Sequence, residues 1–231
     1  MVAQGINPSG LAPIKRERTL GEHAYDRLKQ AMMTGAFRPS EKITVRAIAD
    51  ALNVSITPAR DAITRLITEG ALEARSSKTV IVPPLTPDVL DEVTKLRVNL
   101  EGMAAEAATQ SLGPSDVTKL EKIQDALEEA MANEDYRTVL NRNEDFHFLI
   151  YNASNMPRLI TIIESLWLRI GPSLNLLYPD FAISRKGVSN HRDLIQALRK
   201  GDAAKVRVAI ENDIRAGYAS LERLVTKQFA V

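Results

Sequence analysis

The chain has 231 residues, of which 45% are hydrophobic and 26% charged, so we expect a globular protein of two domains. It has no cysteine, which excludes disulfides, thiolate metal sites and cysteine nucleophiles and fits a reducing compartment. No window approaches 18 apolar residues, and the N-terminus lacks the apolar segment of a signal peptide. We therefore expect a cytoplasmic protein without membrane contact.

Residues 1–19 are expected to form a disordered leader, because they are rich in Gly and Pro and end near the basic run KRER. The alternative is a basic arm that touches a nucleic-acid backbone. A first helix is predicted from about Leu20 to Met33, where apolar residues recur on one face and Gly35 provides the stop.

The range 44–70 predicts two helices joined by a tight turn. The first ends at Asn53, a residue that tolerates the left-handed conformation; the second starts at Ser55 or Thr57 with Pro58 in its first turn. The exposed side of the second helix carries hydroxyl and guanidinium groups, from Ser55, Thr57, Arg60 and Arg65. Such a helix N-terminus suits a phosphate or a base edge. An ordinary helical hairpin remains the alternative for this pair alone.

The residues after Gly70 favour nucleic-acid binding over that alternative. The run ALEAR, the polar tip SSK and the run TVIV predict a β-hairpin with a basic turn that ends at Pro83. A hairpin directly after a recognition helix is the wing of a winged helix-turn-helix. Residues 1–84 carry 12 Lys and Arg against 8 Asp and Glu, whereas the remainder carries 18 against 21. The positive excess therefore lies in the part with the helix-turn-helix, as phosphate binding requires.

The rest of the chain predicts a helical bundle joined to this unit by a short, stiff linker, Pro83–Pro87. Thr86 is the expected cap of the next helix, with Pro87 at its first position. Helices are predicted at about 87–111, 115–132, 135–153, 157–177 with an interruption at Gly171-Pro172, 184–200 and 202–227. Six helices of this length make an antiparallel α-helical bundle.

Across the predicted helix-turn-helix, wing and bundle, the sequence resembles the GntR family of bacterial transcription regulators. It resembles the FadR-type branch, whose ligand domain is called FCD. The residues that match are 28–35, Pro39, Ile43, 46–51, Val54, Ser55, Thr57, Pro58, 60–62, Leu66, 69–70 and the wing, and the likeness extends to about residue 221. The resemblance implies a mainly α fold, with a winged helix-turn-helix domain over 20–83 and an FCD-like bundle of six helices over 84–231. It further implies a homodimer that binds a double-stranded DNA operator.

The resemblance also assigns DNA-contacting residues, namely Arg46, Ser55, Thr57, Pro58, Arg60, Arg75, Ser77 and Lys78. The sequence departs from the family pattern at Ile56, where Arg is usual, and at Thr79, where the wing usually has Gly. Loss of one bidentate arginine can weaken guanine recognition by about 1 to 3 kcal/mol. The operator is therefore expected to differ from the common one of the family.

Three polar side chains are expected to point into the bundle: His147, His191 and Asp213 lie in otherwise apolar helical rows, and Asn143 shares the face of His147. FCD domains typically bind a divalent metal through an Asp and a His four residues apart and two later His. These positions are occupied here by Asn143, His147, His191 and Asp213, so two ligands match and two differ. The set suits Zn, Ni or Mn. The alternative is a pair of core histidines hydrogen-bonded to Asp213 or water.

A second polar group is expected to bind a small organic acid effector. Arg97 lies among apolar residues, and a buried guanidinium needs an anion, either Glu101 four residues later or a carboxylate ligand. Polar groups near the expected interruption of the 157–177 helix complete the predicted effector site, namely Arg169, Asn175 and Tyr178.

Together these features predict a ligand-responsive transcription regulator and not an enzyme. No HExxH run, nucleophile elbow or Gly-rich phosphate loop is present. Two alternatives remain at this stage: a metal-dependent enzyme that uses His147, His191 and Asp213, and a regulator whose ligand site is vestigial.

Overall fold

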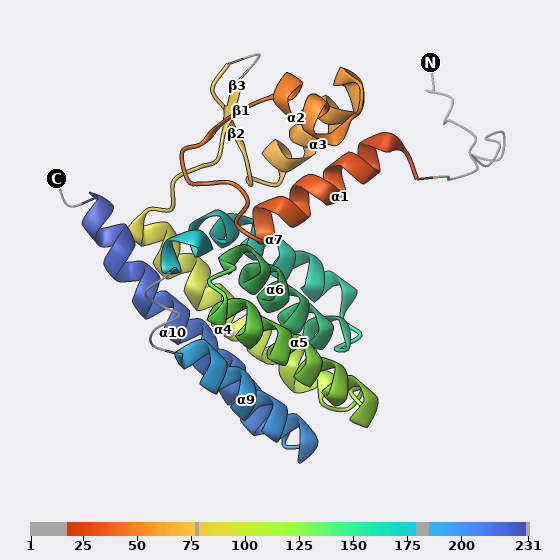
Figure 1. The fold of residues 1–231 in the computed structure, drawn as a ribbon, viewed down its shortest axis with the longest axis vertical. Coiled ribbons are helices and arrows are strands. Elements are labelled where there is room, and N and C mark those ends of the chain that lie inside the picture. The colour runs from red at the N-terminus through yellow and green to blue at the C-terminus, as the bar shows by residue number, and fades with distance from the viewer. Residues whose placement is uncertain (1–17, 77–78, 179–184, 230–231) are drawn as a thin grey trace, which may run out of the picture.

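The computed structural model describes residues 18–76, 79–178 and 185–229, and over them the chain is mainly α-helical, as predicted (Figure 1). A small α/β head lies at one end of a larger helical bundle. The leader expected over 1–19 lies outside the described residues except for Arg18 and Thr19. None of the described helices is long and apolar enough to cross a membrane.

The head has the elements of a winged helix-turn-helix. It contains α1 (Leu20–Met33), β1 (Lys42–Thr44), α2 (Val45–Leu52), α3 (Ile56–Thr68), β2 (Glu73–Ala74) and β3 (Thr79–Ile81). Thr19 and Glu22 form a capping box that starts α1. Asn53 ends α2 with φ of 51°, so the left-handed turn predicted there is confirmed.

The three short strands form an antiparallel sheet in the order β1-β3-β2, with Ile43 opposite Val80 and Ala74 opposite the same residue. The hairpin of β2 and β3 directly follows α3, as the wing prediction requires. One hydrophobic core joins α1, α2, α3 and this sheet, with Leu66 fully buried at its centre.

The bundle contains the six predicted helices. They are α4 (Pro87–Ala108), α5 (Pro114–Ala132), α6 (Tyr136–Asn152), α7 (Pro157–Leu174), α9 (Lys186–Arg199) and α10 (Ala203–Phe229), with the short 3-10 turn η2 (Asn175–Leu177) after α7. Thr86 caps α4 and Pro87 opens it, as expected. In Figure 1 the long helix α10 runs beside α4 and α9, and it packs against both. Trp167, Tyr151 and Phe146 are the largest fully buried side chains.

The interruption predicted at Gly171-Pro172 is wrong, because α7 continues through both residues to Leu174. Proline inside a helix removes one amide donor, and its ring crowds the carbonyl four residues earlier, at a cost of about 3 kcal/mol. Ile170 and Leu174 on either side are buried, so their packing holds the last turn in place.

The reason for a glycine at position 171 is the close approach of α1 to α7. A Cβ built at Gly171 would lie 2.3 Å from the carbonyl oxygen of Met32 and 2.8 Å from Cα of Met33. Two polar contacts flank this point: Lys29 binds Glu164 at 2.6 Å, and the amide of Asn175 donates to the carbonyl of Gly35. The head is therefore packed directly on the bundle through α7, and the two share one hydrophobic core cluster.

We expect Gly171→Ala to destabilise the protein by about 1 to 3 kcal/mol, because the methyl group meets backbone atoms that cannot rotate away. Denaturant unfolding measures this change. Gly217→Ala is the matched control: it lies in α10 with no atom within 4 Å of the added Cβ, so the better helix former should be neutral or stabilising. Equal stability of the two variants would contradict the contact between α1 and α7.

Candidate functional site

The exposed face of α2 and α3 carries the residues predicted to meet DNA. Arg46 and Arg60 have exposed side chains, and within the described chain neither forms an ion pair. Ser55 is the N-cap residue of α3 but makes no side-chain capping bond, and Thr57 beside it is exposed. The hydroxyls and the first amides of α3 thus remain available to a phosphate. Pro58 is half-buried in the first turn.

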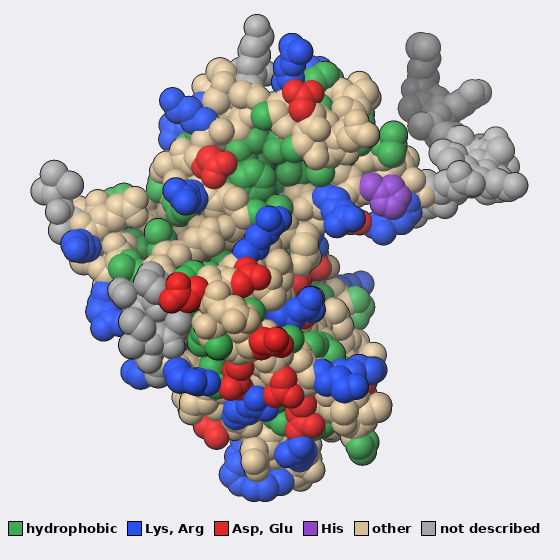
Figure 2. Space-filling model, viewed as in Figure 1, with side chains coloured by type: hydrophobic (Ala, Val, Ile, Leu, Met, Phe, Trp, Pro, Cys, Tyr) green, Lys and Arg blue, Asp and Glu red, His purple; other side chains and the backbone are tan. Residues whose placement is uncertain are grey.

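Other basic residues of the head differ in their surroundings. Arg65 lies on the exposed side of α3 with Arg60, as predicted; it bonds Glu69 at 3.0 Å, and its guanidinium stacks 3.6 Å from the ring centre of Tyr25. Its role is to hold α3 on α1. Arg75 is exposed on the wing, 3.5 Å from Glu73; Ser77 and Lys78 lie outside the described residues. Figure 2 shows Lys and Arg side chains around the head and a denser mixture with Asp and Glu over the bundle.

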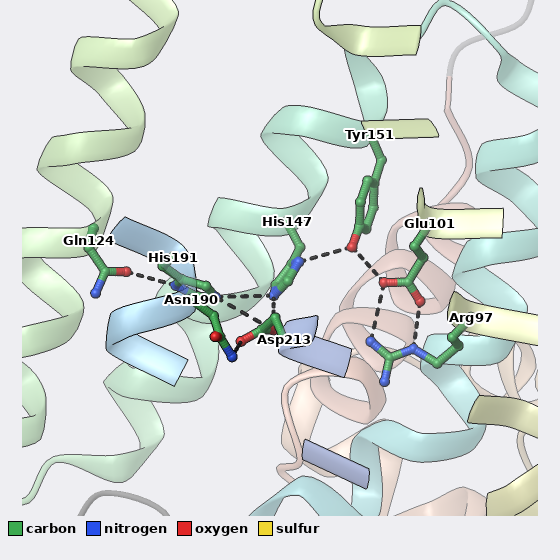
Figure 3. A network of polar contacts seen from close by, with 8 residues as sticks. All are labelled: Arg97, Glu101, Gln124, His147, Tyr151, Asn190, His191 and Asp213. Carbon is green, nitrogen blue, oxygen red and sulfur yellow. Dashed lines mark hydrogen bonds and ion pairs between the residues drawn. The ribbon is translucent and has the colours of Figure 1, made fainter. Parts of the chain in front are cut away.

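Inside the bundle, three side chains from three helices bring their ligand atoms together (Figure 3). Nε2 of His147 lies 3.3 Å from Nε2 of His191 and 3.4 Å from Oδ2 of Asp213, and the third side of the triangle measures 3.8 Å. Both imidazoles are buried, and the Asp213 side chain is 15% exposed. The prediction that these residues point inward is confirmed.

The partners on the far side of each ring determine where its proton lies. Tyr151 donates its hydroxyl proton to Glu101 at 2.5 Å, so Nδ1 of His147, 2.9 Å from the Tyr151 oxygen, must be the donor in that contact. Burial, with Glu101 beside it, raises the pKa of Tyr151 well above its usual value, which keeps that proton in place.

The same reasoning applies to His191. Its Nδ1 lies 2.7 Å from Oε1 of Gln124, and the Gln124 amide nitrogen donates to Glu128, so the oxygen is the atom that faces the ring. An amide oxygen only accepts, so His191 also carries its proton on Nδ1. Both Nε2 atoms therefore direct lone pairs at each other and at the Asp213 carboxylate. These three hydrogen-bond acceptors face one another with no proton between them, and a bound cation would stabilise that arrangement.

The protonation states suit a metal ligand set. Burial lowers the pKa of His191 to about 4, so its imidazole is neutral near pH 7. The Asp213 carboxylate accepts from the side-chain amide of Asn190 at 3.4 Å, a hydrogen bond that favours its ionised form. At a metal–ligand distance of 2.0 to 2.1 Å, tetrahedral ligands lie about 3.3 to 3.4 Å apart, close to the observed spacing. The residues fit a divalent ion.

A cavity of about 60 Å³ adjoins this triangle. A water molecule needs at least roughly 10 to 15 Å³ of such space, so the cavity can hold several waters or a small ligand. The sequence-predicted residues that line it are Arg97, Asn143, His147, Tyr178 and Asp213. Asn143 therefore shares the cavity with His147 and Asp213.

Arg97 is buried and bound to Glu101 through two nitrogens, at 2.5 Å from Nε and 3.2 Å from Nη2. The i, i+4 pair considered from the sequence thus forms, and Glu101 lies behind Arg97 instead of in the cavity lining. Nη1 is left for a further acceptor. Trp167 also lines the cavity, and its Nε1 is the one buried side-chain polar atom without a partner among the described residues.

Two residues predicted for the effector site lie at the junction of head and bundle instead. Asn175 bonds to Gly35 of the head, and neither it nor Arg169 lines the cavity. Burial lowers the pKa of Arg169, while the charge of Glu73 on the wing raises it, which places Arg169 near β2. Ile170 and Leu174, which are next to these two residues in the chain, line the cavity in their place.

Comparison with known proteins agrees with this geometry. Residues 20–82 match the bacterial regulatory proteins of the gntR family, and residues 92–216 match the FCD domain. The chain belongs to the GntR family of transcription regulators with an FCD domain. It is 33% identical over 196 residues to the HTH-type transcriptional regulator McbR of Escherichia coli K12, covering 84% of this chain and 89% of that protein.

Solved structures of this family share the arrangement of the two domains. The structure of E. coli McbR/YncC has a TM-score of 0.84 and 31% identity, covering 92% of this chain and all of that one (100%). A GntR regulator from Rhodococcus sp. RHA1, at 19% identity and a TM-score of 0.70, shares the fold. This GntR-family chain is therefore a DNA-binding transcription regulator and not an enzyme.

Sequence reasoning missed the residues that orient the candidate metal ligands. Tyr151 follows His147 by one helical turn, a spacing that could have revealed it. Gln124 is a polar residue in the buried row of α5, and Asn190, beside His191, donates to Asp213 at 3.4 Å. Such outer partners are what hold each ligand in one tautomer and direction.

We expect Tyr151→Phe to lower divalent metal affinity by about 10- to 100-fold, because it removes the oxygen that holds His147 in its tautomer. Competition with a chromophoric chelator measures this affinity. Tyr218→Phe is the matched control, since Tyr218 lines the same cavity but bonds Glu222 at the surface. An unchanged affinity in Tyr151→Phe would contradict the assignment of the protons.

Proposed function

We propose that a small organic acid, bound in the bundle cavity beside a divalent ion, sets the affinity of this regulator for its operator. His147, His191 and Asp213 would hold the ion, with Asn143 as a further ligand, and Zn, Ni or Mn suits this set of nitrogen and oxygen donors. The observation that carries the proposal is the meeting of two imidazole Nε2 atoms, whose protons lie on Nδ1, with the carboxylate of Asp213.

The cavity supports a carboxylate as the effector. A bound ion gives a carboxylate a positive partner, and the unpaired N–H of Trp167 and Nη1 of Arg97 supply donors on the same wall. Glu101 neutralises much of the Arg97 charge, so the ion provides the larger attraction. Tyr178 closes the lining on the side of η2.

For the DNA contacts we propose Arg46, Ser55, Thr57, Pro58, Arg60, Arg75, Ser77 and Lys78. The exposure of the first two arginines and the uncapped start of α3 support this assignment. Helix N-termini and guanidinium groups bind phosphates, and guanidinium groups also bind guanine edges in the major groove.

Helix α7 is the proposed route from the cavity to the DNA-binding head. Trp167, Ile170 and Leu174 line the cavity, while Gly171 between them touches the backbone of α1. One helix thus separates the effector from the head. An effector that prefers one position of α7 would shift the population of head orientations.

We further propose that the regulator acts as a homodimer, with the DNA-binding domain at 20–83 and the effector and dimerisation domain at 84–231. Leu96 and Met103 support this, since they lie two turns apart on α4 and are 44% and 38% exposed. Sedimentation at the DNA-binding concentration should give twice the chain mass of 25.5 kDa. A monomeric mass would contradict the dimer.

We expect Arg60→Ala to weaken binding to the regulator's own upstream DNA by about 1 to 3 kcal/mol, because a base or phosphate contact is lost. Fluorescence anisotropy at several salt concentrations measures this. Arg158→Ala is the control: it removes the same charge from an exposed position on α7 in the bundle. Unchanged affinity in Arg60→Ala would exclude this residue from the interface.

A screen of organic acids with metal-loaded protein tests the effector. A ligand at 100 times its Kd adds about 2.7 kcal/mol to stability, which a thermal shift detects. We expect Trp167→Phe to reduce the acid-dependent part of this shift while metal binding persists, because the indole N–H donor is lost and an aromatic ring is kept. Leu221→Met, in the same lining, is the control. No shift with any acid would favour a vestigial ligand site.

A further inference from the structure

A second hollow lies between the head and the bundle, separate from the metal cavity. It has a volume of about 740 Å³ and is lined by the end of α1, the loop that follows, the start of α6 and η2. Small-molecule sites usually occupy roughly 300 to 1,000 Å³. We call this hollow the junction groove; its volume is that of a site for an organic ligand.

Three arginines from both domains line the junction groove: Arg27 on α1, Arg38 in the loop after α1, and Arg137 on α6. In the described parts of the chain, none of the three guanidinium groups makes an ion pair or a side-chain hydrogen bond. Elsewhere in the bundle, by contrast, Arg192 and Arg207 each bind two carboxylates.

The acids near the groove do not satisfy these arginines. Glu41 is the one acidic residue of the lining, and its carboxylate accepts from the backbone amide of Arg38 at 2.8 Å. The charge of Arg137 reaches Asp135, but that carboxylate caps α6 through the amide and hydroxyl of Thr138. The lining thus holds three positive groups against one negative group.

The remaining lining is polar and aromatic. Gln30 and Asn175 use their amides on Glu144 and Gly35, so the guanidinium groups are the strong donors left in the groove. Tyr136 and Tyr178 stack at 5.0 Å and form an aromatic wall, and Tyr178 also lines the metal cavity. The two sites therefore share one wall.

We propose that the junction groove is a second ligand site, which takes a small organic or inorganic oxyanion with at least two negative charges. Such a ligand would bind Arg27 and Arg38 of the head together with Arg137 of the bundle. It would thereby fix the orientation of the head through contacts that involve neither the metal nor an acid in the cavity. A regulator with both sites responds to two signals.

A phosphate of the operator is the competing occupant. The groove is lined partly by α6 of the bundle, whereas the exposed DNA-binding arginines lie on α2 and α3. Because the groove includes part of the bundle and lies away from the DNA-binding arginines, a small molecule from solvent is the favoured occupant. The test below distinguishes the two.

The experiment is calorimetric titration of the full-length protein with inorganic pyrophosphate and, separately, with succinate. The first probe represents phosphorylated ligands and the second dicarboxylates. We expect at least one to bind, and each of Arg27→Ala, Arg38→Ala and Arg137→Ala to weaken binding by about tenfold or more. Arg158→Ala removes the same charge outside the groove and should bind like the parent protein.

A background variant separates this site from the proposed metal cavity. Pyrophosphate also binds divalent ions, so the titration is repeated in Asp213→Ala, where the affinity should be unchanged. Loss of binding in Asp213→Ala, equal weakening in Arg158→Ala, or no binding of either anion would overturn the proposal. Weaker DNA binding with a smaller salt slope in the groove variants, without anion binding, would instead identify operator phosphate as the occupant.

Discussion

The packing of α7 against α1 is the contact on which the arrangement of this regulator depends. At Gly171 the backbone of α1 lies so close that an added Cβ would be 2.3 Å from a carbonyl oxygen. Packed interiors transmit displacement because they have little free volume. Trp167, Ile170 and Leu174 of the same helix line the cavity beside His147 and Asp213, so α7 contacts both that cavity and the DNA-binding head.

The buried polar residues of the bundle form one connected network. Arg97 binds Glu101, Glu101 accepts from Tyr151, and Tyr151 accepts from His147 in the metal triangle. The network therefore links the side chain expected to meet a carboxylate with the residues expected to hold the ion. Every member restrains the next, because an unpaired polar group is costly in a buried site. A ligand at one end thus meets a preorganised site.

Local patterns explain which predictions were correct. The spacing of apolar residues, the turn at Asn53 and the cap at Thr86 each depend on neighbours within one or two turns, so the winged helix-turn-helix and the six bundle helices could be predicted. The prediction failed at Gly171-Pro172 because a local helix-breaking signal was outweighed by packing on both faces of α7. Arg65 is exposed as predicted, but its contact with Tyr25 of α1 could not be predicted because the two residues are far apart in the chain.

The sequence by itself determined the fold, the family and the inward direction of His147, His191 and Asp213, because helical periodicity sets the face on which each residue lies. Only the tertiary structure decided that their three ligand atoms meet with the protons on the outer nitrogens, since the tautomers depend on Gln124 of α5 and on Glu101 of α4, which accepts the Tyr151 proton. The tertiary structure also places Asn175 at the domain junction, whereas the sequence predicted it in the effector site. Contacts between residues far apart in the chain have no local signature, and they arise only once the helices pack.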